Sequence, residues 1–215
     1  MIQRRIKLTL AFDGTAYSGW QRQRTQATVQ GVLEEKISNL TGERISLHGA
    51  GRTDAGVHAL AMVAHFDIAA TIPCRAFKYG LNSMLPQDIR VLQADEVEVD
   101  FHARRSAVGK CYFYQFCQTE VMLPTARLYW VGIKKKLNMD LMEKCLPFII
   151  GCHDFSTFEA AGSRDVTRPG RGANRRIFSA RFDDKSDGKY RFTICGDGFL
   201  RHMGSVTLRL ACPLV

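Results

Sequence analysis

The sequence predicts an α+β protein built mainly on antiparallel sheet. Some segments alternate apolar and polar residues, which is the period of a half-buried strand, and others repeat apolar residues at helical spacing. The expected order is strand, helix, strand, strand, helix, strand, strand, followed by helix, strand, strand. The 215 residues are enough for two small domains, so we expect two halves, 1–105 and 106–215, with a cleft between them.

The first strand and the first helix have clear local signals. Residues 5–12 form the expected strand, because every second residue from Ile6 to Phe12 is apolar. A polar loop rich in turn residues follows it. Thr28 is a suitable N-cap for a helix that ends near Gly42.

Weaker signals place the following elements, up to residue 117. We expect a short strand over residues 45–47, a glycine-punctuated loop, and a strand near residues 62–68. Pro73 is expected to begin the second helix. Strands are then predicted over residues 89–99 and 110–117.

A less regular stretch near residues 121–136 precedes the remaining elements of the second half. Asp140 is expected to cap a helix that runs to about Ile150, with Pro147 bending or ending it. Two strands, over residues 177–183 and 190–195, are expected to be joined by a polar turn.

The charge balance favours a polyanionic partner. Thirty Lys and Arg residues stand against 21 Asp and Glu residues, which gives a net charge of +9 and a pI near 9.4. The polyanion that a basic globular domain binds is most often nucleic acid, although many soluble proteins are basic for no specific reason. The apolar runs are too short to span a bilayer, and the N-terminus alternates like a strand rather than a signal peptide.

The seven cysteines and six histidines show no metal-binding spacing. No Cys-x-x-Cys pair occurs, and the histidines lack nearby ligands that would complete a motif. We therefore expect reduced thiols in a cytoplasmic protein, and no metal site.

The segment GAGRTDAGVHA, residues 49–59, has the strongest chemical signal. Its glycines permit tight backbone turns and the close approach of a ligand. Arg52 has a planar guanidinium that suits a phosphate or a base stack, and Asp54 is a candidate nucleophile or general base. From spacing alone, an Arg–Asp pair that only fixes a turn is an equally good interpretation.

GRTDAGVHA, residues 51–59, resembles the signature loop of the TruA-type tRNA pseudouridine synthases. The resemblance extends over most of residues 5–203, because other segments match family segments in the same order. These segments are FDGTAYSGWQRQ (12–23), TVQGVLEEKI (28–37), LNSMLPQDI (81–89), DFHARRSAVGKCYFY (100–114), HDFSTFEAAG (153–162) and GDGFLRHM (196–203).

The resemblance implies a fold, a reaction and three site residues. It implies the pseudouridine synthase fold, with two similar halves and a central cleft, and isomerisation of uridine to pseudouridine at positions 38 to 40 of tRNA. Asp54 matches the catalytic aspartate, Arg52 the arginine associated with extruding the nucleotide, and Tyr112 the aromatic residue that stacks on the uracil. No organic cofactor and no metal are implied, and family members are usually cytoplasmic homodimers.

Several further arginines are candidates for contacts with the tRNA anticodon stem-loop. They lie in loops or near the motif residues, where phosphate contacts would position the RNA without reading its sequence. These candidates are Arg22, Arg24, Arg104, Arg105, Arg168, Arg171 and Arg175.

After Met203 the sequence departs from the family, whose members continue well past this point. Ser205 stands where the family has a basic residue that pairs with the catalytic aspartate. We therefore expect a less stable chain with weak or no activity, unless Arg201 or Arg209 reaches Asp54. The alternative function is a non-catalytic RNA-binding remnant of the same fold.

A further interpretation uses the residues without the family. Asp13 and Asp54 are a possible carboxylate pair for hydrolysis of a glycosidic bond. The ordered matches make this the least favoured hypothesis, and release of free uracil would identify it.

Overall fold

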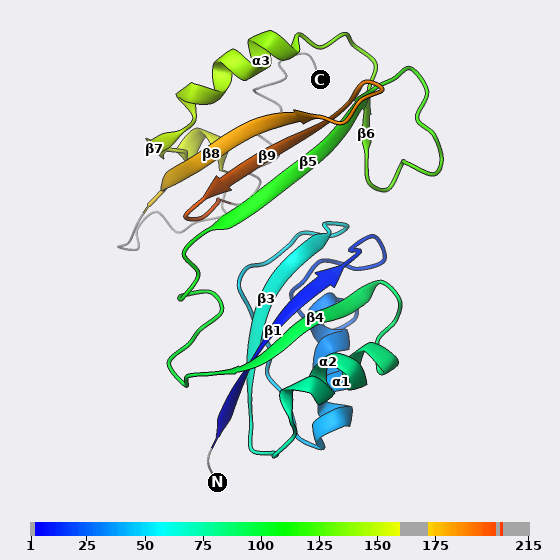
Figure 1. The fold of residues 1–215 in the computed structure, drawn as a ribbon, viewed down its shortest axis with the longest axis vertical. Coiled ribbons are helices and arrows are strands. Elements are labelled where there is room, and N and C mark those ends of the chain that lie inside the picture. The colour runs from blue at the N-terminus through cyan, green and yellow to red at the C-terminus, as the bar shows by residue number, and fades with distance from the viewer. Residues whose placement is uncertain (1–2, 160–171, 201–202, 204–215) are drawn as a thin grey trace. The chain divides into compact units, whose positions relative to one another are not determined.

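The computed structural model describes residues 3–159, 172–200 and 203. The chain divides into two compact units, 1–107 and 108–215, each with its own sheet and hydrophobic core (Figure 1). The predicted α+β class with mainly antiparallel strands is confirmed.

The first unit has a four-stranded antiparallel sheet in the order β2-β3-β1-β4. Both helices lie on one face of this sheet (Figure 1). The elements are β1 (Arg4–Phe12), α1 (Val29–Thr41), β2 (His48–Gly49), β3 (Ala59–Ile68), α2 (Cys74–Met84) and β4 (Ile89–Val97).

Alternation along β1 and β3 builds the core of the first unit. Ile6, Leu8 and Leu10 are fully buried and pack with Leu33 of α1 and Phe77 of α2. Burying such side chains contributes roughly 1.5–3 kcal/mol each. The sheet is therefore anchored on one side, and its strand ends can support loops.

The second unit has a five-stranded sheet in the order β6-β5-β9-β8-β7, with one parallel pair, β5 and β6. Its core gathers around Phe116, Phe192 and Ile194. The elements are β5 (Lys110–Gln118), β6 (Val131–Ile133), α3 (Met139–Cys145), β7 (Gly151–Asp154), β8 (Asn174–Asp184) and β9 (Lys189–Gly196), with short 3-10 helices at Leu146–Phe148 and Ser156–Phe158.

Two of the predicted elements need correction. No strand forms over residues 45–47, because the Ile45 and Leu47 amides donate to the side chains of Ser38 and Glu34 on α1. The strand β2 begins only at His48. The helix expected up to Ile150 is α3, which ends at Cys145, and Pro147 lies in the 3-10 helix that follows.

The cysteines also correct one expectation. Cys111 on β5 and Cys195 on β9 form a disulfide, so the prediction of reduced thiols is wrong for this pair. The antiparallel register places the two residues directly opposite each other, with Cα atoms 4.1 Å apart. The two cysteines are 84 residues apart in the sequence, and this spacing did not indicate a disulfide. The free cysteines of the described residues are Cys74, Cys117, Cys145 and Cys152.

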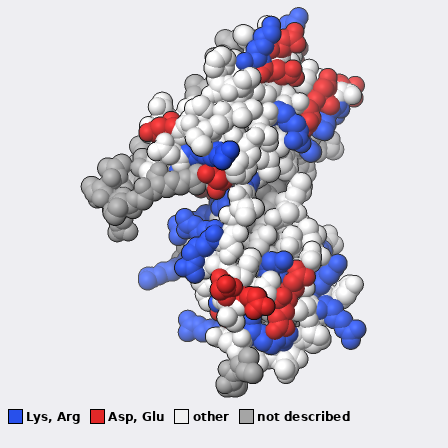
Figure 2. All heavy atoms as spheres, turned by 60° about the vertical axis from the view of Figure 1, so that its left-hand side comes forward, with Lys and Arg blue, Asp and Glu red and all other residues white. Residues whose placement is uncertain are grey.

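Basic side chains are spread over both units on the face drawn in Figure 2, several of them beside acidic ones. Ion pairs use part of this charge, as in Arg5 with Asp67 and Lys7 with Asp95. Within the part of the chain that is described, no helix is both long and apolar enough to cross a membrane.

Candidate active site

Arg52 and Asp54 lie in the loop of residues 50–58 between β2 and β3, which we call the aspartate loop. Both residues are exposed. The Ala50 amide donates to the Val63 carbonyl at 2.8 Å, so the loop starts from a fixed strand edge. The Val57 amide donates to the Asp54 carbonyl at 3.2 Å, which folds the backbone into a turn just after Asp54. The sequence expectation that Asp54 is presented from a loop therefore agrees with its position.

A second loop, residues 13–23, directly follows β1 and supports the aspartate loop; we call it the supporting loop. The Trp20 amide donates to the Thr53 carbonyl at 3.1 Å, and the Gly56 amide donates to the Tyr17 carbonyl at 3.2 Å. These bonds hold the backbone on both sides of Asp54. Two segments far apart in the sequence thus form one unit around this carboxylate.

Close approach of the two loops depends on glycine at two positions. A Cβ at Gly19 would overlap the Thr53 carbonyl oxygen, and the φ of Gly19 is +88°, a left-handed conformation that favours glycine. A Cβ at Gly49 would lie 2.6 Å from the indole ring of Trp20. Gly19 therefore permits backbone contact between the two loops, and Gly49 leaves room for the Trp20 ring.

Side chains reinforce the same junction. Asp13 Oδ1 lies 2.9 Å from His58 Nδ1, and the Gly14 amide lies 3.2 Å from that nitrogen. The Tyr17 hydroxyl donates to Asp88 Oδ1 at 2.8 Å. Burial, followed by the Asp88 carboxylate, raises the pKa of Tyr17, so the phenol keeps its proton at neutral pH.

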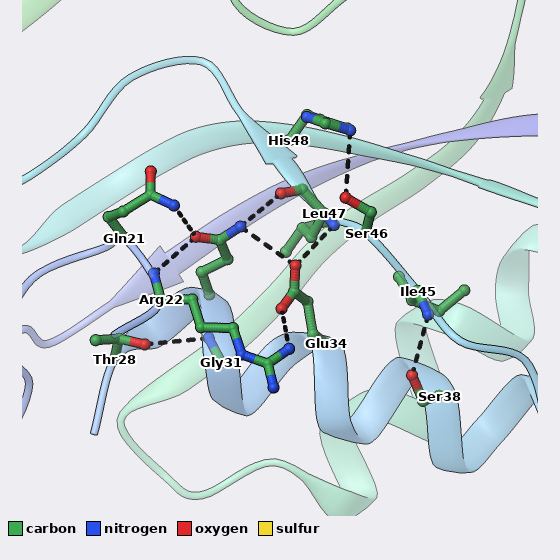
Figure 3. A network of polar contacts seen from close by, with 11 residues as sticks. Gln21, Arg22, Thr28, Gly31, Glu34, Ser38, Ile45, Ser46, Leu47 and His48 are labelled. Atoms are coloured by element: carbon green, nitrogen blue, oxygen red, sulfur yellow. Dashed lines mark hydrogen bonds and ion pairs between the residues drawn. The ribbon is translucent and has the colours of Figure 1, made fainter. Parts of the chain in front are cut away.

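A polar network ties the end of the supporting loop to α1 and to the start of β2 (Figure 3). The buried Glu34 carboxylate accepts from the Leu47 amide at 3.0 Å and from Gln30 Nε2 at 3.2 Å, and it pairs with Arg22 Nη1 at 3.0 Å. Gln30 Oε1 in turn accepts from the Arg22 amide at 2.8 Å. A cavity of about 500 Å³, lined by Arg22, Gln26, Glu34 and Arg44 among others, lies beside this network.

Tyr112 belongs to the second unit, on β5. Its side chain is partly exposed, and its ring meets the edge of Phe199 with centroids 4.8 Å apart. On the opposite face of the sheet, the Arg191 guanidinium lies 4.8 Å from the centre of the Phe113 ring. The exposed part of the Tyr112 ring is suited to stacking on a nucleobase.

The other predicted arginines are dispersed. Arg22 and Arg24 lie in and just after the supporting loop, and Arg104 and Arg105 follow β4 in a turn whose amides donate to His102 Nδ1. Arg175 is on β8, where its guanidinium donates to the Gly172 and Asn174 carbonyls. Arg168, Arg171, Arg201, Ser205 and Arg209 lie outside the described residues.

Sequence reasoning missed the role of His58 and gave Asp13 a different one. The Asp13 carboxylate accepts from the amide and hydroxyl of Thr15 and lies against His58, which does not favour its use as a hydrolytic partner of Asp54. The glycines of both motifs signalled a close approach, but only the structure identifies the two loops that meet.

Comparison with known proteins gives a consistent result. A family model described as tRNA pseudouridine synthase matches residues 9–104. The chain is 50% identical over 201 residues to tRNA pseudouridine synthase A 1 of Desulfotalea psychrophila, covering 93% of this chain and 80% of that protein. It is 40% identical over 200 residues to tRNA pseudouridine synthase A of Acetivibrio thermocellus, with the same coverage. It is also 42% identical to the Geobacter sp. (strain M21) protein of that name, with 93% and 78% covered.

Proposed function

Because the chain belongs to the TruA-type tRNA pseudouridine synthases, we propose that it isomerises uridine to pseudouridine in the anticodon arm of tRNA, with Asp54 as its catalytic carboxylate. One observation supports this most directly: Asp54 is exposed in a loop whose backbone is hydrogen-bonded to the supporting loop on both sides. Such a carboxylate is accessible to a nucleotide and held in place before it arrives.

The reaction breaks the N1–C1′ glycosidic bond, turns the uracil, and joins C5 to C1′. C5 loses its proton to solvent and N1 gains one, so product and substrate have the same composition. Asp54 has two possible roles in it, attack on the ribose C1′ or removal of the C2′ proton to give a glycal. A uridine inside a stem cannot reach the carboxylate, so the nucleotide must be extruded at a cost of about a few kcal/mol.

Arg52 and Tyr112 supply the other two proposed roles. Arg52 would fill the space that the uridine leaves and contact phosphate, as its exposed position next to Asp54 allows. Tyr112 would hold the detached uracil by stacking, an interaction worth ~1–3 kcal/mol per base. The partly exposed ring of Tyr112 supports this role.

The proposal extends to partners and location. The tRNA stem would meet Arg22, Arg24, Arg104 and Arg105, which are exposed, and also Arg175, Arg168 and Arg171. We further propose a cytoplasmic homodimer, in line with the family resemblance. The alternative, a non-catalytic RNA-binding protein, draws no support from the described residues or from the relatives, and the tail that suggested it lies outside the described residues.

Release of tritium from tRNA labelled at uracil C5 tests the function directly. The sequence after Met203 predicts weak activity, so every variant is compared with the parent chain. We expect measurable release by the parent, and none above background by Asp54→Asn while its affinity for tRNA stays within about threefold. Asp187→Asn is the matched control, because it makes the same change in an exposed left-handed turn that Asn tolerates.

Two results would count against the proposal. Parent-like release by Asp54→Asn would remove Asp54 from the mechanism. Free uracil among the products would indicate hydrolysis instead of isomerisation.

A further inference from the structure

We propose that His58, held by Asp13, is a positioning residue that fixes the aspartate loop and so aims the Asp54 carboxylate at the ribose. The inference rests on the proposed catalytic role of Asp54. It assigns a task to the Asp13–His58 contact, which joins the two loops through side chains.

The backbone of the aspartate loop is held on both sides of Asp54. Before Asp54, the Ala50 amide is bonded to β3 and the Thr53 carbonyl to the Trp20 amide. After Asp54, the Gly56 amide is bonded to the Tyr17 carbonyl at 3.2 Å, and Gly56 itself has a left-handed φ of +76°. Because glycine is flexible, a side-chain anchor between this turn and the start of β3 at Ala59 restricts the loop further, in addition to the close backbone approach of Gly14 to Val57. His58 is that anchor.

The anchor point on the other side is rigid. Asp13 directly follows β1, and its amide donates to the Asp88 carbonyl at 2.9 Å. Its Oδ1 also accepts from the Thr15 amide at 2.9 Å and the Thr15 hydroxyl at 2.6 Å, which fixes the carboxylate orientation. A histidine bonded to this carboxylate is therefore fixed to the end of the sheet.

The contact suits either form of His58 Nδ1. A ring nitrogen that bears a proton donates, and here it would donate to Asp13 Oδ1 at 2.9 Å. A nitrogen without a proton accepts, and here it would accept from the Gly14 amide at 3.2 Å. Both side chains are about 30% exposed, so the junction is partly shielded from water. His58 thus has a partner on the supporting loop in each case.

Removal of this anchor should act on the chemical step. A misplacement of about 1 Å in a catalytic group can slow a reaction about a hundredfold. The predicted tRNA contacts at Arg24, Arg104 and Arg105 lie outside the two loops that His58 joins, whereas Arg52 lies in the aspartate loop. We therefore expect kcat to fall by a larger factor than KM rises.

The test compares His58→Ala with His58→Asn in single-turnover assays on tRNA labelled at uracil C5. The Asn side chain places an amide near the position of Nδ1, so it can still donate to Asp13. We expect the rate to fall at least tenfold in His58→Ala, with tRNA affinity within threefold of the parent, and to be largely restored in His58→Asn. His153→Ala, at an exposed histidine of the second unit, is the control and should match the parent.

Hydrogen exchange of the segment 49–59 provides a readout that does not need activity. We expect faster exchange in His58→Ala than in the parent, and near-parental exchange in His58→Asn. Asp13→Asn preserves the oxygen that Thr15 uses but weakens the contact with His58, so it should fall between the two. It carries the test if His58→Ala does not fold.

Two outcomes would overturn the proposal. One is a single-turnover rate and a hydrogen exchange of segment 49–59 that both equal those of the parent, in His58→Ala or in Asp13→Asn. The other is a His58→Asn protein that reacts as slowly as His58→Ala. Asp54→Asn is assayed in parallel. If it stays active, the proposed role of Asp54 fails, whereas the exchange data still decide whether His58 holds the loop.

Discussion

His65 shows how one residue couples the first unit to pH. It lies on β3, is almost fully buried, and accepts from the Ala103 amide through Nδ1 at 3.2 Å. Its ring stacks on His48 and lies 4.8 Å from the His102 ring, measured between centroids. Burial first, and then the positive charge of Arg5, lower the pKa of His65 to about 4. The ring is therefore neutral in the folded protein at neutral pH.

This lowered pKa predicts acid sensitivity of the first unit. In the unfolded chain the pKa of His65 is about 6.5. Between that pH and about 4 the unfolded state therefore binds a proton that the folded state does not, which stabilises the unfolded state relative to the folded one. The free energy of unfolding should fall by about 2 kcal/mol between pH 7 and pH 4.5 from this group alone. His65→Asn places an oxygen near the position of Nδ1, can still accept from Ala103, and should remove that part of the pH dependence.

Urea unfolding at several pH values measures the free energy of unfolding of the parent and of His65→Asn. The signal is the fluorescence of the buried Trp20, and Trp130→Phe is present in both proteins so that Trp20 is the remaining tryptophan. The same pH dependence in parent and His65→Asn would show that His65 does not titrate as stated.

At the residue scale the sequence predicted the loop position of Arg52 and Asp54 better than the contacts that hold this loop. Arg52 and Asp54 were placed in a glycine-containing loop, because Gly49, Gly51 and Gly56 are visible in the motif. The anchoring by Asp13 and His58 was not predictable, since it joins residues from two loops that are distant in sequence. Contacts of this kind depend on how the strands pair, which local patterns do not report.

Among the elements, helix α1 connects the two halves of the polar network. Its Glu34 satisfies the Leu47 amide, which cannot pair with a neighbouring strand because β2 begins only at His48. Arg22 and Gln30 share the same carboxylate. One helical side chain therefore fixes both the supporting loop and the segment that leads into the aspartate loop.

Glu34→Ala should thus destabilise the first unit. It leaves the buried Leu47 amide without an acceptor, which costs about 1–3 kcal/mol. Glu35→Ala is the control, because Glu35 is exposed and pairs with its neighbour Lys36, an interaction worth about 1 kcal/mol at most. Chemical denaturation of the two variants measures the difference, and an equal decrease in stability would contradict the assigned role of Glu34.

Element prediction succeeded where the signal was local. The cap of α1 was predicted from Thr28, whose hydroxyl accepts from the Gly31 amide, and its end from Gly42, which has a left-handed φ of +71°. Strand β6 was missed because three residues pair in parallel with β5 and show no alternation of their own. Strand β7 was missed because its sequence, GCHD, is mostly polar and exposed.

For the whole molecule, the net charge of +9 predicts tRNA binding that weakens strongly with salt. Arg104 and Arg105 are the sharpest test among the described arginines, because both are exposed in a turn whose backbone is held by His102. Replacing both with Ala should lower the slope of log affinity against log salt by roughly 0.7–0.9 for each phosphate that the protein no longer neutralises. The turn itself should persist, because the hydrogen bonds to His102 are donated by the backbone amides and not by the arginine side chains.

The control must remove the same charge from a place where no tRNA is expected. Arg181→Ala with Lys185→Ala does this in the second unit, where the Arg181 side chain pairs with Asp183 at 3.1 Å. Filter binding of tRNA between low and high salt should give a parental slope for this pair and a shallower slope for the Arg104/Arg105 pair. Equal slopes in the two double variants would mean that the altered affinity reflects total charge alone, and that the tRNA does not contact Arg104 and Arg105.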